Sequence, residues 1–185
     1  MIKDRKELKE FIRADRDALK QKHPFLAKIT FGEHARIRTF LYVLRYAEYW
    51  NSRNDIWGKI CFAFYYLRYR RLCLKYNIFI ALNTLGKGVC IEHPGFIRID
   101  SFCSIGENCT ILPMVLLGKK KPTVDCFINI GNNCYIGTGA TILGPVSIGN
   151  NVTIAAGAVV LHDVPDNVVV AGVPAKIVKS NQKIQ

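Results

Sequence analysis

Residues 136–153 read IGTGATILGPVSIGNNVT, and an isoleucine opens each six-residue unit of this stretch. The same step of six recurs through the second half of the chain, and the residue that opens each unit, which we call a rung, is Ile, Leu or Val. The rungs are Ile99, Ile105, Ile111, Leu117, Ile130, Ile136, Ile142, Ile148, Ile154 and Val160. A helix repeats near 3.6 residues and an amphipathic strand every 2, so a sustained period of six indicates a stacked repeat.

The remaining positions of each unit indicate short strands joined by tight corners. Glycine often follows the rung, and a small or β-branched residue stands four positions after it. Gly tolerates backbone conformations that other residues avoid, which suits a corner. Stacking such units buries the rungs in one column, and each rung contributes roughly 1.5–3 kcal/mol if fully buried.

The runs Ile136–Thr141 and Ile148–Thr153 closely resemble the repeats of the hexapeptide-repeat acyltransferases, and the resemblance covers roughly residues 80–178. Chains of that family wind into a left-handed β-helix with three hexads per triangular turn. The resemblance therefore implies a mixed fold, with an N-terminal α-helical region followed by a left-handed parallel β-helix of hexapeptide repeats. We expect a helical domain at 1–77, the β-helix at 78–178 and a C-terminal tail at 179–185.

The N-terminal region differs from the coil in charge and in pattern. Residues 1–80 carry a net charge of +10 and the remaining residues only +2. Apolar spacing predicts helices over about 4–22, 35–50 and 55–76, with His23-Pro24 ending the first. The aromatic and basic mixture favours a bundle packing on itself or on another subunit. Peripheral membrane contact through the basic helices is the next interpretation, and nucleic acid is disfavoured because no binding motif accompanies the charge.

Hydropathy and cysteine spacing argue against a membrane-spanning, secreted or metal-binding protein. No run of about 18 apolar residues and no secretory signal is visible, which favours a cytoplasmic location. The seven cysteines lack CxxC spacing, and three occupy the small slot of the repeat. They are expected to be buried reduced thiols, and we expect no metal site.

Two interruptions break the ladder. The step from Ile91 to Ile99 is eight, and the two extra residues fall within 92–96, where His93 lies. An insertion can re-aim a side chain out of the regular lattice, although this position alone favours an ordinary surface histidine at a corner. The step from Leu117 to Ile130 is thirteen residues, whereas two complete hexads would take twelve. Residues 118–125 are therefore predicted to form an extruded loop. Its Lys119-Lys120-Lys121 run is usually just solvated, although it would attract a phosphate-bearing cofactor or an acidic acceptor.

Both interruptions resemble the architecture of serine acetyltransferases and their relatives. The matching elements are Glu92-His93 before a Gly-containing insertion, Leu117-Gly118, and the stretch 171–176, AGVPAK. Residues 14–19 also resemble the shortened helical region of relatives often associated with capsule loci. The resemblance implies an acetyl-CoA-dependent O-acetyltransferase in which His93 is the catalytic base. A neutral imidazole suits removal of the acceptor's hydroxyl proton near neutral pH.

The resemblance also implies binding residues and an assembly. Family members form trimers and bind coenzyme A in a groove between coils of adjacent subunits, so a homotrimer is expected and pairing of trimers through the helices is left open. Contacts to the donor are mostly with the backbone of small residues, which allow close approach. The residues carried over for acetyl-CoA are Gly118, Gly137, Thr138, Gly139, Ala155, Ala156, Ala171, Gly172 and Lys176.

The acceptor is the least determined part. Glu92 keeps the acid that contacts the amino group of serine, but the stretch 78–83 lacks the Asp that pairs with the base in serine acetyltransferases. Asn83 is then a candidate to orient His93, unless the partner comes from elsewhere. Phe127 stands where a second substrate-binding His is found. The acceptor is therefore serine or a serine-like compound, or alternatively a sugar hydroxyl of a capsular or surface polysaccharide.

Two further classes compete with the acetyltransferase. A non-catalytic trimeric scaffold remains the rival from another class. The zinc carbonic anhydrases built on the same coil need three histidines at a subunit interface, whereas only His93 and His162 lie in the coiled half.

Overall fold

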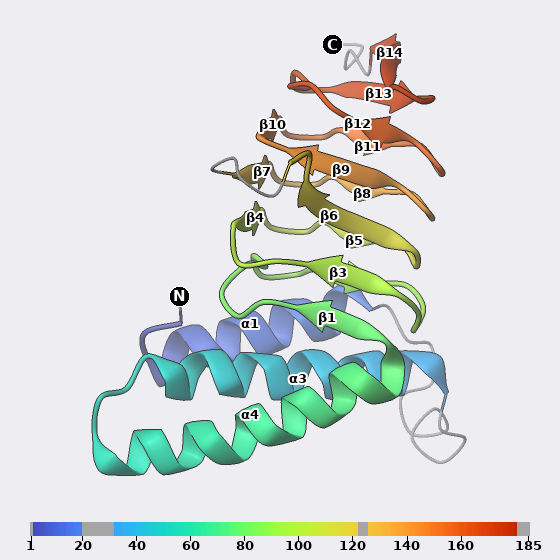
Figure 1. Cartoon of the computed structure of the whole chain (residues 1–185). Coiled ribbons are helices and arrows are strands. Elements are labelled where there is room, and N and C mark those ends of the chain that lie inside the picture. The colour runs from blue at the N-terminus through green and yellow to red at the C-terminus, as the bar shows by residue number, and fades with distance from the viewer. Residues whose placement is uncertain (1, 20–31, 122–125, 181–185) are drawn as a thin grey trace.

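The computed structural model describes residues 2–19, 32–121 and 126–180. Figure 1 shows a layer of helices at one end and a stack of strands that rises from it toward the C-terminus. The helices are α1 (Arg5–Ala18), α3 (Glu33–Asn51) and α4 (Ile56–Tyr76). The predicted stop at His23-Pro24 lies outside the described residues, and α1 already ends at Ala18. No helix among the described residues is long and apolar enough to span a membrane.

Local capping explains where the helices begin and end. The Asp4 side chain accepts a hydrogen bond from the N–H of Glu7 at the start of α1, at 2.8 Å. Asp55 does the same for the N–H of Gly58 at the start of α4, at 3.2 Å. Asn77 ends α4 in the left-handed conformation, with φ at 56°. The chain is thereby turned directly into the first strand of the coil.

The strands form three faces of a parallel coil, and each turn of the coil passes through all three. The first face holds β1 (Ile78–Ile80), β3 (Ile97–Ile99), β6 (Val115–Lys119), β9 (Thr141–Gly144) and β12 (Val159–Val160). The second face holds β4 (Cys103–Ile105), β7 (Ile128–Ile130) and β10 (Val146–Ile148). The third face holds β2 (Cys90–Ile91), β5 (Thr110–Ile111), β8 (Tyr135–Ile136), β11 (Thr153–Ile154), β13 (Val168–Ala171) and β14 (Lys176–Ser180). The predicted left-handed parallel β-helix is confirmed, and β14 alone of these strands pairs antiparallel.

The six-residue ladder is the core of this coil. On the third face, Ile111 pairs in register with Ile91 and Ile136, and Ile154 continues the column. Every predicted rung is buried, and so is every residue predicted for the small slot. The period of six therefore reflects one buried large side chain and one buried small side chain on each face of a turn.

The second interruption is larger than the sequence suggested. Leu117 lies on the first face and Ile130 on the second, so the step joins neighbouring faces and should take six residues, as it does from Ile99 to Ile105. The step takes thirteen residues, so seven residues are inserted. The expectation that twelve residues separate these two rungs in an uninterrupted coil was wrong. Gly118 and Lys119 continue β6, so the loop begins after Lys119. Its residues 122–125 lie outside the described part of the chain.

The helical layer caps the open lower end of the coil through Arg45. This guanidinium is fully buried and donates to the carboxylates of Asp15 at 2.8 Å and Glu48 at 3.0 Å. It also donates to the backbone carbonyls of Leu85 at 2.9 Å and Gly86 at 2.6 Å. These carbonyls belong to the lowest turn, which has no further turn beneath it to pair with.

Other backbone groups of the lowest turn are capped in the same way. The two carboxylates that hold Arg45 also accept from the N–H groups of Gly88 at 2.8 Å and Asn83 at 2.7 Å. On the first face, the buried Tyr69 hydroxyl of α4 donates to the carbonyl of Ile80 and accepts from its N–H at 3.3 Å. Side chains of all three helices thus replace the hydrogen bonds of a missing turn.

Replacing Arg45 by Ala should lower the free energy of unfolding by about 3–5 kcal/mol, because two buried carboxylates and two carbonyls lose their partner. Urea unfolding followed by circular dichroism measures this change. The matched control is Arg13→Ala, which removes an exposed partner of Asp17 on α1 and should leave the midpoint nearly unchanged. Equal, small effects of the two substitutions would contradict the capping role.

Candidate active site

His93 lies at the corner that joins the third face to the first, between β2 and β3. Its ring is about half exposed, and Nδ1 lies 2.7 Å from Oε2 of Glu33, the first residue of α3. A carboxylate can only accept a hydrogen bond, so in the neutral imidazole Nδ1 carries the proton. The lone pair is then on Nε2, which is the atom able to take a proton from a hydroxyl.

Glu33 was not predicted from the sequence as a site residue. It is separated from His93 by 60 positions, so no local spacing connects the two residues. Its only sequence signal is an acidic residue near the start of a predicted helix. The contact depends on how the helical layer sits beneath the coil, and that placement follows from the Arg45 cap.

Asn83 does not orient His93 in this structure. It lies at the corner between the first and second faces, whereas His93 lies at the corner between the third and first. Asn83 has a φ of 62°, and its backbone N–H donates to Glu48. The partner that contacts the His93 ring is Glu33, so it comes from elsewhere, the other possibility left open by the sequence.

Glu92 is only partly exposed and faces a neighbouring thiol. Its Oε1 accepts a hydrogen bond from Sγ of Cys90 at 3.5 Å. Burial, and then the charge of Glu92, raise the pKa of Cys90 to about 12. The thiol is therefore protonated near neutral pH and is a poor nucleophile. The site consequently offers an imidazole base rather than a thiolate.

The corners that join the third face to the first stack into a ridge at residues 92–96, 112–114, 137–140 and 155–158. The turn at 172–175, which joins β13 to β14, continues this ridge upward and is hydrogen-bonded to Val159 below it. We call these five segments together the His93 edge. Backbone hydrogen bonds connect its levels, from the N–H of Met114 to the carbonyl of Phe96 and from the N–H of Gly139 to that of Pro113. Higher up, the N–H of Gly157 donates to the carbonyl of Thr138. His93 occupies the lowest level.

Most residues predicted to bind acetyl-CoA lie on or at this edge. Those within it are Gly137, Thr138, Gly139, Ala155, Ala156 and Gly172, and Ala171 directly precedes its top level. Lys176 pairs with Ala171 at the start of β14, so it lies beside the upper end. Gly118 lies on the first face, in β6, and not on the edge. The structure therefore gathers eight of the nine residues along one ridge.

Close stacking requires the small residues of this ridge. A Cβ on Gly137 would lie 2.6 Å from the backbone nitrogen of Ala156, closer than real atoms approach. Gly139 adopts a φ of 73°, which favours glycine. Residues 137–140 and 155–158 of the ridge consequently present backbone rather than large side chains, which suits a ligand lying along them, whereas Met114 is exposed at the level directly above His93.

The described lysines of the second interruption lie at a different edge. Lys120 Nζ donates to the carbonyl of Leu161, which follows β12 at a corner between the first and second faces. Lys119 Nζ lies 5.6 Å from the ring centre of Phe102, next to β4. Phe127 is exposed just before β7, on the second face. Within one chain, these residues do not line the His93 edge.

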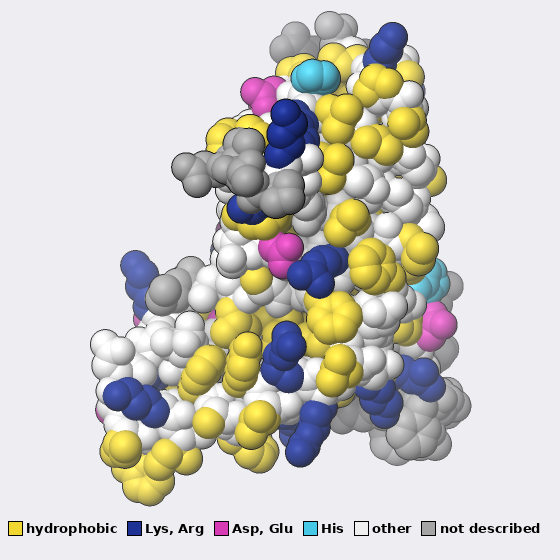
Figure 2. All heavy atoms as spheres, viewed as in Figure 1, with side chains coloured by type: hydrophobic (Ala, Val, Ile, Leu, Met, Phe, Trp, Pro, Cys, Tyr) yellow, Lys and Arg dark blue, Asp and Glu magenta, His cyan; other side chains and the backbone are white. Residues whose placement is uncertain are grey.

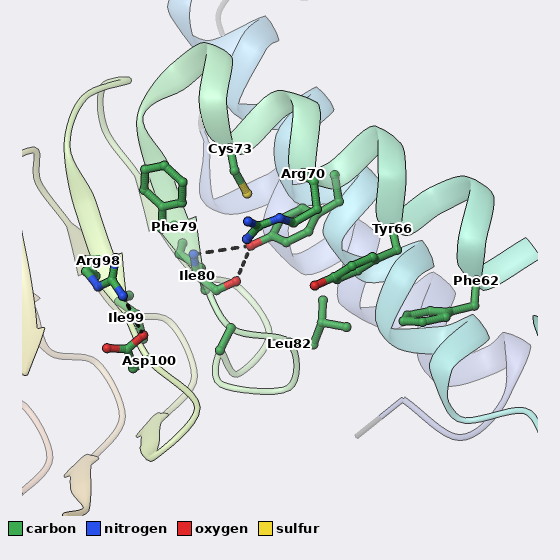
Figure 3. Close-up of a pocket in the computed structure, with 12 residues that line it drawn as sticks. Phe62, Tyr66, Arg70, Cys73, Phe79, Ile80, Leu82, Arg98, Ile99 and Asp100 are labelled. Atoms are coloured by element: carbon green, nitrogen blue, oxygen red, sulfur yellow. Dashed lines mark hydrogen bonds and ion pairs between the residues drawn. The ribbon is translucent and has the colours of Figure 1, made fainter.

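A separate cavity of about 650 Å³ lies between α4 and the lowest turns of the first face. Figure 3 shows Phe62 and Tyr66 of α4 on one side of it and Phe79 and Leu82 of the coil near by. Arg98, paired with Asp100 at 3.5 Å, lies on the coil side. His93 does not line this cavity. Among the described residues, no group of three His, Cys, Asp or Glu is placed to hold a metal ion.

Comparison with known proteins shows which proteins the coil is similar to. Residues 127–162 match the bacterial transferase hexapeptide (six repeats) family. Over 107 residues the chain is 37% identical to a serine acetyltransferase of Bacillus subtilis (strain 168), an alignment covering 54% of this chain and 46% of the relative. It is 47% identical over 100 residues to serine acetyltransferase 5 of Arabidopsis thaliana, covering 54% of this chain and 32% of the relative. The chain thus spans less than half the length of these relatives.

Solved structures extend the similarity to the helical layer. The crystal structure of Neisseria gonorrhoeae serine acetyltransferase superposes with a TM-score of 0.71 at 27% identity, covering 96% of this chain and 67% of that chain. The crystal structure of the Brucella abortus strain S19 serine acetyltransferase in complex with coenzyme A superposes with a TM-score of 0.71 at 28% identity. The match covers 95% of this chain and 69% of that chain. Residues 127–162 are thus similar to the hexapeptide-repeat family. The fold of this chain, helices included, is serine acetyltransferase-like.

Cys90 should be alkylated by iodoacetamide at pH 7.5 at least about a hundredfold more slowly than free cysteine, because its raised pKa leaves little thiolate. The rate should rise about tenfold per pH unit as the pH approaches 12. Mass spectrometry of the peptide containing Cys90 measures the rate. A rate as fast as that of free cysteine, and flat above pH 9, would show an activated thiol instead.

Proposed function

We propose that this protein transfers an acetyl group from acetyl-CoA to a hydroxyl group, with His93 as the general base. The observation that carries the proposal is the Nδ1–Glu33 hydrogen bond at the lowest level of an edge whose corners at 137–140 and 155–158 consist of small residues. The relatives support it, because they are named serine acetyltransferases and one solved neighbour is in complex with coenzyme A.

The proposed reaction is a direct transfer. Nε2 of His93 takes the hydroxyl proton while the oxygen attacks the thioester carbonyl and forms a tetrahedral oxyanion, which backbone N–H groups stabilise. Collapse breaks the C–S bond and releases the thiolate of coenzyme A, which takes the proton back from His93. Glu33 accepts from Nδ1 throughout, so it fixes the ring and offsets the charge of the imidazolium. Protonated Cys90 takes no part.

The donor is proposed to lie along the His93 edge, with its thioester at the His93 level. The small corners admit it close to the backbone. A single chain supplies only one wall for a ligand on a convex ridge. The second wall is proposed to come from the neighbouring subunit of a homotrimer, which would also supply Gly118, Lys119 and Lys120.

The acceptor is proposed to be serine or a serine-like amino alcohol. The carboxylate of Glu92, adjacent to His93, is suited to a protonated amino group, and a relative from Neisseria gonorrhoeae has been solved in complex with serine. A sugar hydroxyl of a surface polysaccharide is the second candidate. It is favoured by Phe127, whose exposed ring would offer an apolar face to a sugar ring if the neighbouring subunit brings it to the His93 edge.

Replacing His93 by Ala should lower kcat by roughly 10²–10⁴ while binding of coenzyme A persists, because only proton removal is lost. Release of free thiol from acetyl-CoA with serine, an amino sugar or an oligosaccharide measures the rate and identifies the acceptor. Isothermal titration with coenzyme A is the control. Full activity of the variant would refute the mechanism, and the absence of transfer by the parent chain to every acceptor would favour the scaffold.

Glu33→Ala should lower kcat by about 100-fold, and Glu33→Gln should lower it by about 10-fold. The Gln oxygen still accepts from Nδ1 but lacks the charge, so its effect is smaller. KM for acetyl-CoA should stay within about twofold, because Glu33 does not touch the donor. The control, Glu10→Gln, removes another exposed carboxylate from the helical layer. A role in folding alone would lower the thermal midpoint and leave kcat of the folded enzyme unchanged, contrary to this expectation.

A further inference from the structure

The outer face of α4 is an exposed apolar surface that the proposed reaction does not use. Six large hydrophobic side chains on it are between 53% and 70% exposed. They are Ile56, Trp57, Ile60, Phe64, Leu67 and Leu74. Isolated exposed hydrophobics are common, but a contiguous set of this size marks an interaction site.

Helical geometry places these six side chains together. At 3.6 residues per turn they fall within an arc of about 100°. The opposite side of α4 packs on α3 and the coil and buries Gly58, Tyr69 and Cys73. The 21 residues of α4 extend about 32 Å, so the outer face is a long stripe rather than a point contact. Figure 2 shows hydrophobic side chains along α4 with lysine and arginine side chains between them.

The charges around the stripe are of one sign. Arg71 lies within it, Arg68 and Lys75 border one side, and Lys59 and Arg70 border the other; all five are exposed. α4 contains no Asp or Glu. Two copies of this face brought together would oppose cation to cation, which disfavours self-association. A surface that combines an apolar interior with negative charge is the complementary partner.

We propose that the outer face of α4 docks the protein on an anionic lipid bilayer. The apolar side chains enter the boundary between headgroups and acyl chains, and the flanking cations contact lipid phosphates. The helix lies parallel to the membrane. Because the coil rises from the other side of the helical layer, the β-helix would project away from the lipid (Figure 1).

Co-sedimentation of the full chain with vesicles tests this. The chain should bind phosphatidylcholine vesicles that contain about 30 mol% phosphatidylglycerol and bind pure phosphatidylcholine weakly, with binding that fades as salt rises. Trp57→Ala combined with Phe64→Ala should weaken partition at least about tenfold. Arg68, Arg70 and Arg71 changed together to Gln should weaken it about a hundredfold, since each cation near the surface contributes about fivefold.

The matched control changes Lys6, Lys9 and Arg13 of α1 to Gln, which removes the same charge from the same layer and should weaken binding less than about fivefold. His93→Ala should bind vesicles as the parent does, so the docking and the proposed reaction are tested separately. No binding at low salt, or an equal loss in the α1 variant, would overturn the proposal. A change in solution mass on Trp57→Ala with Phe64→Ala, without vesicle binding, would instead assign the face to contact between copies.

Discussion

The ion-pair cluster of Arg45, Asp15 and Glu48 joins the helical layer to the coil. A β-helix must end somewhere, and its last turn leaves backbone donors and acceptors without a neighbouring strand. Burial lowers the pKa of the Arg45 guanidinium, but the charges of Glu48 and Asp15 raise it more, so the side chain is charged in place. Such a cluster is stable only because nearly every donor and acceptor in it has a partner, several of them on the lowest turn of the coil.

That cap also determines the geometry of the candidate site. α3 carries Arg45 in its interior and Glu33 at its first residue, so fixing the helix against the coil sets the position of Glu33 beneath His93. The carboxylate that contacts His93 therefore comes from a helix, whereas the sequence comparison with serine acetyltransferases led us to look for it in the coil, at 78–83. In the upper levels of the His93 edge, close stacking leaves no room for a side chain at Gly137, and the small corners at 137–140 and 155–158 would let a ligand lie against the backbone. Stability of the coil and access for the proposed donor therefore depend on the same residues.

The sequence predicted what is local and periodic. Each rung from Ile99 to Val160 is buried as expected, because the period is a property of neighbouring residues and needs no knowledge of the tertiary arrangement. The three helices were also predicted, with boundaries shifted by a few residues. The length of the second insertion was misjudged, because the sequence does not show which face a rung occupies. The partner of His93 was the hardest feature to predict, because the contact is made by Glu33, 60 positions away, and not by Asn83. Arg45 gave no signal, because a basic residue within a helix is usually exposed.

The measurement that tests the central claim most directly is a crystal structure of this chain with coenzyme A. Our account predicts that the ligand lies along the His93 edge, between the corners of one subunit and its neighbour, with the sulfur nearest Nε2 of His93 and the Nδ1–Glu33 hydrogen bond intact. Coenzyme A bound at another edge, or in the cavity between α4 and the coil, would contradict it. A ligand on the His93 edge with the ring turned away from Glu33 would contradict the assigned tautomer.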